Sequence, residues 1–367
     1  MSTLRVVVKI GTSVLTNGTP SLSPQRMLEI VQQVAAAHQA GHEIIIVSSG
    51  AVAAGRERLG FPELGRSLPA KQMLSAVGQS RLMQTYSALF DIFNIVVAQL
   101  LLTREDISDR PRHLNIRDTL SNLIDQRIIP IINENDTTAT HEIRVGDNDN
   151  LSAMVAGLVE ADLLILLTDQ QGLFTADPRT QPDAQLIAEV AQIDDTTWAA
   201  AGGAGTRLGT GGMTTKLQAA QLAGRSGVTT VIASGRTPDV LTRLLSGDAI
   251  GTRFPAQISH MESRKRWLLM EKPRGALHID AGAAKKLLTG GASLLPVGVT
   301  RIARDFERGA VVSVHAPDGR EIAHGITNYD SDDLRRLCGV KSTQIIDLLG
   351  YSYGDAVIHR NNMVVLV

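Results

Sequence analysis

Two lysines stand where a chain could present cations to a phosphate group. Lys9 lies within the β-branched run 6–10 and precedes a small turn, Gly11-Thr12-Ser13. A lysine in a buried run is costly unless its ammonium group reaches solvent or an anion. The second, Lys216, follows the glycine-rich stretch 209–215 and opens a helical pattern. Backbone N–H groups of such a loop bind anions, and an anion would offset a cation in the first helical turn, so the pattern indicates phosphate binding.

Neither lysine excludes a structural role. Lys9 taken alone is better interpreted as a strand-edge residue, and the stretch before Lys216 could be a flexible loop with a capping lysine. The loop is also not a Walker A motif, because no Gly-x-x-x-x-Gly-Lys-Ser/Thr occurs anywhere in the chain. The functional interpretation therefore depends on the other polar motifs.

Two clusters of amides and carboxylates follow at Asn133-Glu134-Asn135-Asp136 and Gly146-Asp147-Asn148-Asp149-Asn150. Such residues also cap helices and shape loops, which is the alternative explanation. A calcium loop of the EF-hand type is not supported, because the alternating ligands, the following glycine and the distal glutamate are absent. Amides together with carboxylates suit a ligand that carries both an ammonium and a carboxylate group, which describes an amino acid.

Two further strand ends carry small or acidic residues. Ser48-Ser49-Gly50-Ala51 leads from a strand into a helix, and its small side chains would let backbone N–H groups approach an anion. Thr168-Asp169 ends the apolar run 163–167 and precedes a glycine turn. Each motif alone also fits an ordinary close-packed turn.

An alternation of strands and helices must position these motifs. Apolar runs at 6–10, 44–47, 95–100, 128–132, 163–167 and 230–233 predict strands buried on both faces. Helical patterns lie between them, around 27–34, 114–124 and 217–223. The sequence therefore predicts an α/β fold, a three-layer sandwich with a mainly parallel central sheet. Functional residues should gather at the carboxyl ends of its strands.

The pattern changes near residue 255, so we expect a first domain at 1–255, a linker at 256–274, a small mostly-β domain at 275–354 and a tail at 355–367. Asp318-Gly319 between two β-rich runs predicts a hairpin, and residues 363–367 could add a last strand. Two domains also fit the length of 367 residues.

Composition excludes several classes. A net charge of -1 argues against a strongly basic nucleic-acid binder, and the single cysteine, Cys338, excludes an internal disulfide or a cysteine-rich metal site. Aromatic residues make up only 3%, which disfavours stacking platforms for RNA. No apolar run is long enough to span a membrane and no signal-peptide pattern is present, so we expect a cytoplasmic protein without membrane contact.

These motifs, in this order, resemble the amino acid kinase family, and within it the members that phosphorylate glutamate. Residues 290–299, 306–309 and 322–325 resemble a PUA domain, a fold first seen in RNA-modifying enzymes. Together the likenesses cover nearly the whole chain. They imply ATP-dependent phosphorylation of the L-glutamate γ-carboxylate to L-glutamyl 5-phosphate, the first step of proline biosynthesis, with proline as feedback inhibitor. They also imply Mg²⁺ and a homo-oligomer, a dimer or a tetramer. No protein ligand for Mg²⁺ is assigned, because the ion often keeps its waters.

The resemblance also implies a role for each matching residue. Lys9 and Lys216 would contact the transferring phosphoryl group, and Asp149 would orient them. The glutamate site would comprise Ser49, Gly50, Ala51, Asn133, Asp136, Asp147 and Asn148. The ATP site would comprise Lys9, Gly11, Thr168, Asp169, Thr210, Gly211, Gly212, Met213, Thr214, Thr215 and Lys216.

Two alternatives stay open at this point. Another amino acid kinase, acting on aspartate, N-acetylglutamate, carbamate or uridylate, would share the fold and the nucleotide loop. An RNA-binding or RNA-modifying protein would use the C-terminal domain, supported by Arg264-Lys265-Arg266 and by Arg301, Arg304 and Arg308. RNA is therefore a possible partner, but not the expected primary one.

Overall fold

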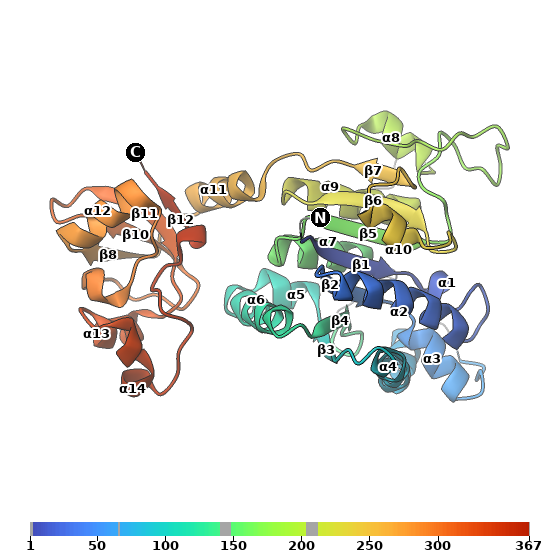
Figure 1. Ribbon diagram of the computed structural model, residues 1–367, viewed down its shortest axis with the longest axis horizontal. Helices are drawn as coiled ribbons and strands as arrows, with labels where there is room; N and C mark the ends of the chain where they lie inside the picture. Colours follow the sequence, from blue (N-terminus) through green and yellow to red (C-terminus); the bar gives the residue numbers. More distant parts are fainter. Residues whose placement is uncertain (1–2, 65–66, 140–147, 203–211, 367) are drawn as a thin grey trace. The chain divides into compact units, whose positions relative to one another are not determined.

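The computed structural model describes residues 3–64, 67–139, 148–202 and 212–366, and the chain forms two compact units (Figure 1). The first unit comprises Met1–Ser108 and Ile116–Ser259, and the second comprises Asp109–Asn115 and His260–Val367. No helix in the described ranges is both long and apolar enough to cross a bilayer.

A seven-stranded sheet forms the centre of the first unit (Figure 1). Its strands are β1 (Arg5–Ile10), β2 (Glu43–Ser48), β3 (Val97–Leu102), β4 (Ile129–Glu134), β5 (Leu163–Thr168), β6 (Thr229–Ser234) and β7 (Thr252–Phe254). They are ordered β3-β4-β2-β1-β5-β6-β7, and every pairing is parallel except that of β7 with β6. The predicted mainly parallel sheet is confirmed.

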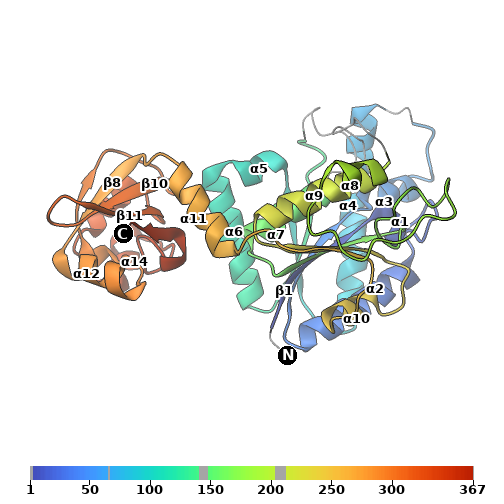
Figure 2. The same ribbon diagram turned by 90° about the horizontal axis from the view of Figure 1, so that it is seen from above.

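Helices cover both faces of this sheet, as Figure 2 shows for α2 and α10 on one side and α7 and α9 on the other. The helices are α1 (Thr12–Leu15), α2 (Pro24–Gln39), α3 (Ala51–Arg58), α4 (Leu68–Asp91), α5 (Arg104–Ser108), α6 (Arg110–Asp125), α7 (Asn148–Leu158), α8 (Asp195–Ala200), α9 (Met213–Arg225) and α10 (Val240–Leu245). Two separate apolar cores result, one on each face, so the three-layer α/β sandwich is confirmed.

Alternation along β1 decides where Lys9 points. Val6, Val8 and Ile10 belong to the core under α2, whereas Val7 belongs to the core under α7 and α9. Because side chains alternate along a strand, Lys9 shares the face of Val7. Its side chain is therefore directed toward the helices that carry the other candidate charged groups.

The strand β3 differs from the expectation of burial on both faces. It begins at Val97 rather than Ile95, and most of its residues are partly or fully exposed. The physical reason is its place at the edge of the sheet, where β4 is its one partner among the described strands. Its leucines gave an apolar run that resembles a central strand.

Helices α3 and α4 pack at unusually short range through two glycines. A Cβ added at Gly78 would lie 1.8 Å from the carbonyl oxygen of Ala51, and one at Gly55 would lie 1.9 Å from that of Leu74. Only glycine permits such backbone contact. The first turn of α3 is therefore fixed against the middle of α4.

The second unit contains a five-stranded sheet, ordered β12-β11-β10-β8-β9. Its elements are β8 (Gly275–Ile279), β9 (Val299–Ala303), β10 (Val311–His315), β11 (Glu321–Ile326), β12 (Met363–Val365), α11 (His260–Met270), α12 (Ala281–Gly290), α13 (Ser331–Leu337) and α14 (Ile345–Leu349), with single 3₁₀ turns at Pro296–Gly298, Ser342–Gln344 and Arg360–Asn362. Strands β10 and β11 pair antiparallel across Asp318-Gly319, and β12 adds to β11, so the predicted hairpin and last strand are confirmed.

A helix, α11, occupies much of the segment that the sequence analysis interpreted as a linker. Its Leu268 is buried against Val311 and Val364 of the second sheet. Among the side chains of α11 that the structure describes, Leu268 alone belongs to this core, which is too little to give the segment a repeated apolar stripe that periodicity could detect. The domain boundaries at 255 and 275 stay predictions.

Candidate functional site

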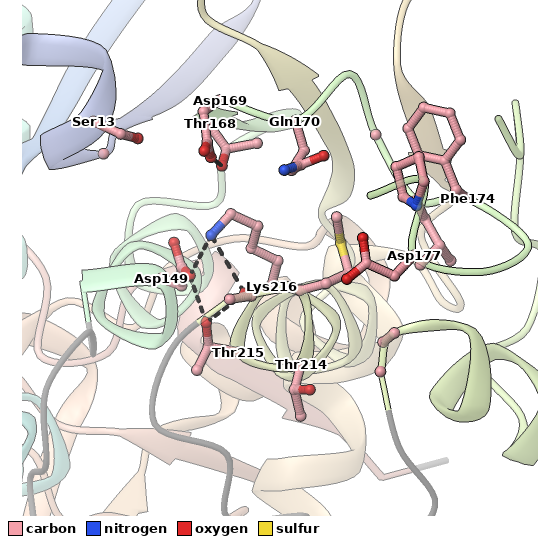
Figure 3. A pocket seen from close by; sticks show the side chains of 18 of the residues that line it. Ser13, Asp149, Thr168, Asp169, Gln170, Phe174, Asp177, Thr214, Thr215 and Lys216 are labelled. Carbon is pink, nitrogen blue, oxygen red and sulfur yellow. Dashed lines mark hydrogen bonds and ion pairs between the residues drawn. The ribbon is translucent and has the colours of Figure 1, made fainter. Parts of the chain in front are cut away.

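Three charged side chains meet at one end of the first sheet. Lys9 Nζ lies 2.7 Å from Asp149 Oδ1, and Lys216 Nζ lies 3.1 Å from Asp149 Oδ2. Thr215 Oγ1 donates a hydrogen bond of 2.8 Å to the same Oδ2 (Figure 3). Asp149 is only 2% exposed, and both lysines are below 10%. We call Lys9, Asp149 and Lys216 the charge cluster.

Three elements bring the charge cluster together. Lys9 comes from the carboxyl half of β1, Asp149 from the first turn of α7 and Lys216 from the first turn of α9. A carboxylate is favourable in a first turn, whereas a cation is not. Asp149 therefore partly offsets the unfavourable position of the Lys216 cation at the start of α9. The sequence analysis expected a bound anion alone to do so.

Burial and charge act against each other in this cluster. Burial lowers the pKa of Lys9, Asp149 opposes that change, and the nearby Lys216 lowers the pKa further. For Asp149, burial alone would raise the pKa, but the ammonium groups of Lys9 and Lys216 outweigh it and hold the carboxyl pKa below its ordinary value. With one anion for two cations, the cluster keeps excess positive charge that suits a phosphoryl group.

A cavity of about 710 Å³ opens beside the charge cluster. Figure 3 shows Thr168, Asp169 and Gln170 on one side of Lys216, and Thr214 and Thr215 on the other. The candidate residues that line this cavity are Lys9, Gly11, Ser49, Asp149, Thr168, Asp169, Gly212, Met213, Thr214, Thr215 and Lys216. Its volume and lining suit a polar molecule of nucleotide size.

Glycine is required where α9 begins. Gly212 has φ 94° and ψ -153°, a conformation that side chains with a Cβ rarely adopt, and it precedes Met213 directly. At the other rim, the Gly11 N–H donates to the carbonyl oxygen of Leu167, which ties β1 to β5 at the cavity floor. The backbone at the start of α9 is thus specified by residue type, and that at Gly11 is held by a main-chain hydrogen bond.

A second cavity, of about 820 Å³, shares Thr12 and Ser49 with the first. The candidate residues that line it are Ser49, Gly50, Ala51, Asn133, Asp136 and Asn148. Gly50 has φ 100° and leads into α3, so the left-handed backbone there also favours glycine. Two adjoining cavities could therefore hold two substrates side by side.

Amide groups form a chain along the wall of the second cavity. Asn148 Nδ2 donates to Ser49 Oγ at 3.1 Å and to Asn133 Oδ1 at 3.0 Å, and Asn133 Nδ2 donates to Gln79 Oε1 at 2.8 Å. Within the described residues, Asn148 Oδ1 is buried without a hydrogen-bond partner. A buried oxygen of this kind lacks the partner that such atoms normally have, and a ligand donor such as an ammonium group would supply it.

Three candidate residues, Asp147, Thr210 and Gly211, lie outside the described residues. All other candidates line one of the two cavities. The sequence analysis did not identify several further lining residues, among them Thr16, Arg56, Phe61, Lys71, Gln170, Phe174, Asp177 and Arg179. Arg56 and Lys71 lie on helices at positions typical of solvated surface charges, so no local pattern distinguishes them.

Known protein families and curated proteins match nearly the whole chain. Residues 4–234 match the amino acid kinase family, and residues 275–349 match the PUA domain. A glutamate 5-kinase of Sodalis glossinidius (strain morsitans) is 54% identical over 363 residues, which covers 99% of each chain. The glutamate 5-kinase of Deinococcus radiodurans is 52% identical over 363 residues, covering 99% of this chain and all of that protein.

Among solved structures, the UMP kinase of Bacillus anthracis aligns with 69% of this chain and 96% of its own. The identity is 16% and the TM-score is 0.47, values too low to support an argument about function or fold.

Proposed function

The chain belongs to the amino acid kinase family, and from this premise we infer that it transfers the γ-phosphoryl group of ATP to the γ-carboxylate of L-glutamate. The product is L-glutamyl 5-phosphate, and the reaction is the first step of proline biosynthesis. The relatives that carry this activity in their names match over nearly the full length of both chains.

The observation that carries this inference is that the charge cluster lines one of two adjoining cavities, which share Thr12 and Ser49. The first cavity is lined by Lys9, Asp149 and Lys216, and the second is lined by the amide residues Asn133 and Asn148. ATP would occupy the first cavity and glutamate the second, with the reacting oxygens meeting near Ser49, which lines both.

The chemistry requires little proton transfer. A glutamate carboxyl group, with an ordinary pKa of about 4.3, is already ionised at neutral pH and needs no general base. Accordingly, among the described residues no histidine lines either cavity. The main barrier is the approach of one anion to another, so positioning and cationic charge must supply most of the catalysis.

Roles follow from these positions. Lys9 and Lys216 stabilise the charge on the transferring phosphoryl group, and Asp149 holds the two ammonium groups. Thr168, Asp169 and the start of α9 bind the nucleotide. Ser49, Asn133, Asp136 and Asn148 bind glutamate. Asn148 Oδ1, which has no hydrogen-bond partner among the described residues, accepts from the substrate ammonium.

Mg²⁺ fits this site as part of the ATP complex. Within the described residues, no cluster of three carboxylate, histidine or cysteine side chains could hold a metal ion by itself. Oxygens of the triphosphate and water would supply most ligands, as is usual for this ion. When bound, Mg²⁺ neutralises phosphate charge, while Lys9 and Lys216 orient and screen the transferred group.

A substrate panel tests the function. The purified full-length protein, with ATP and Mg²⁺, is given L-glutamate, N-acetylglutamate, aspartate, carbamate or UMP, and ADP release is measured. Hydroxylamine traps any acyl phosphate as a hydroxamate. We expect glutamate-dependent ADP and hydroxamate, both lost in Lys216→Ala but kept in Lys285→Ala, which changes an exposed lysine of the second unit. Turnover of N-acetylglutamate but not glutamate would overturn the proposal.

Further proposals concern regulation and assembly. Proline acts as feedback inhibitor by competing with glutamate for the second cavity, since both are amino acids. Inhibition that added glutamate leaves unchanged would contradict this. We propose a cytoplasmic homo-oligomer, a dimer or a tetramer, and sedimentation would determine its size. RNA stays a secondary partner of the PUA domain, testable by a salt-dependent mobility shift.

A further inference from the structure

We propose that Ser75 and Gln79, two residues of α4 that line neither cavity, position the amino-acid site from behind and set its affinity for glutamate. The proposal rests on the function inferred above. It concerns positioning residues, which act on the substrate only through other side chains.

The evidence for Gln79 is the direction of the amide chain. Its Oε1 accepts from Asn133 Nδ2 in a buried hydrogen bond of 2.8 Å. The Asn133 oxygen must then face the opposite way, where it accepts from Asn148 Nδ2 at 3.0 Å and from the Glu134 N–H at 2.9 Å. With its NH₂ group engaged, Asn148 presents Oδ1 as the atom left for a ligand.

Gln79 determines which way the side-chain amides of Asn133 and Asn148 face. If the Asn133 amide turned over, its NH₂ group would face the NH₂ group of Asn148, and two donors would oppose each other. Asn148 would then either shift from its place beside the Ser48 carbonyl, to which its Nδ2 donates at 3.2 Å, or turn and present a donor to the substrate ammonium, which is itself only a donor. An acceptor at Gln79 therefore keeps both asparagines in the orientation that receives an ammonium group.

Ser75, on the same face of α4, holds a second residue of the proposed glutamate site, Asp136. Its Oγ donates to Asp136 Oδ2 at 2.5 Å, although the two residues are 61 positions apart. Ser75 and Gln79 are four residues apart, so they lie one above the other on one face of α4. Both are buried, at 3% and 9% exposure. One helix face thus supports Asp136 and Asn133 together.

The same helix also fixes a third part of the site. Gly78, between Ser75 and Gln79, lies against the carbonyl of Ala51, the first residue of α3 and part of the second cavity. Helix α4 therefore supports the glutamate site at three points from behind, in addition to Lys71, which lines the second cavity itself. Rigid support of this kind is needed to hold binding groups to within fractions of an ångström.

The test compares Gln79→Leu, which removes the acceptor, with Gln79→Glu, which keeps an oxygen at that position. Gln84→Leu changes an exposed glutamine of the same helix and serves as the control. Steady-state kinetics give KM for glutamate, KM for ATP and kcat for each protein. We expect Gln79→Leu to raise KM for glutamate about tenfold, the effect of one lost hydrogen bond of about 1.4 kcal/mol. KM for ATP should stay within about twofold, and Gln79→Glu should recover most of the loss.

A double-mutant cycle with Asn148→Ala tests whether Gln79 acts through the amide chain. If it does, Gln79→Leu should reduce kcat/KM for glutamate far less in the Asn148→Ala background than in the unchanged protein. A full, multiplicative loss in both backgrounds would overturn the proposal. So would an equal change in the ATP and glutamate KM values, since that indicates a general structural defect.

Ser75→Ala supplies an independent measurement, with Ser80→Ala as its control because the hydrogen bond described for Ser80 Oγ is to the carbonyl of Val77 in its own helix. We expect a rise of about fivefold in KM for glutamate from Ser75→Ala and none from Ser80→Ala. Should Gln79→Leu fail to fold, an unchanged KM in Ser75→Ala would by itself refute the joint role of the two residues. An unchanged protein that shows no glutamate-dependent ADP release would instead refute the proposed function.

Discussion

Replacing Asp149 by asparagine removes the only carboxylate described in contact with both Lys9 and Lys216, while the shape of the side chain is kept. At an effective dielectric constant of about 20, the separations of 2.7 and 3.1 Å correspond to about 6 and about 5 kcal/mol of attraction. Desolvation of the three groups offsets much of this, so breaking the buried cluster should destabilise the fold by about 3–5 kcal/mol. Turnover should fall by about 100-fold or more, because the ammonium groups lose their fixed positions.

The pH dependence gives the sharper readout. Because the pKa of folded Asp149 is held below its ordinary value of 3.8, its contribution to stability is present above that value and is lost as the pH falls through the folded pKa. The stability difference between the unchanged protein and Asp149→Asn should therefore shrink in acid. At the alkaline end, Asp149 normally opposes the lowering of the Lys9 pKa, so its loss should move the alkaline fall in kcat to lower pH.

Urea unfolding between pH 3 and 8 and kcat between pH 6 and 10 would measure both effects. Asp125→Asn, an exposed carboxylate at the end of α6, is the control and should change neither. An Asp149→Asn protein with kcat within twofold of the unchanged protein and the same alkaline limb would refute the reasoning.

Three more outcomes are expected. Lys216→Ala should lower kcat by about 100-fold, about 3 kcal/mol, with folding retained by circular dichroism, and near-normal turnover would contradict its assigned role. Gly78→Ala should destabilise the protein by about 1–3 kcal/mol in urea and raise KM for glutamate, because a Cβ there would lie 1.8 Å from the Ala51 oxygen. Tyr329→Phe should cost about 1 kcal/mol in the second unit, where the hydroxyl donates to the carbonyl of Gly354 at 2.6 Å and accepts from the N–H of Tyr353; an unchanged melting temperature would count against this.

Local patterns were sufficient to locate six of the seven strands described in the first unit. The six apolar runs correspond to β1 to β6, because strands covered on both faces must be continuously apolar. The short antiparallel β7 was not predicted, since three residues carry no pattern. For β3 the same rule predicted burial on both faces, which is wrong. The sequence does not reveal which strand lies at the edge of the sheet.

The site was predictable only in part. Motifs at strand ends identified Lys9, Asn133 and Thr168 because each sits within a distinctive local string. The residues of α4 that contact the site from behind belong to no such sequence motif. Ser75 and Gln79 look like ordinary polar residues of a long helix, and their partners lie 61 and 54 positions away. Which side chains face each other over such separations is settled by packing, not by spacing.

The strand order has a consequence for the folding of the protein during its synthesis on the ribosome. The first strand made, β1, lies in the middle of the sheet and needs β5 as well as β2 beside it. The charge cluster around Lys9 likewise cannot form until Asp149 and Lys216, which lie much later in the chain, have been synthesised. Contacts between such distant segments slow folding. The nascent chain therefore carries a half-paired central strand through much of its synthesis, and the charge cluster is complete only after α9 has left the exit tunnel.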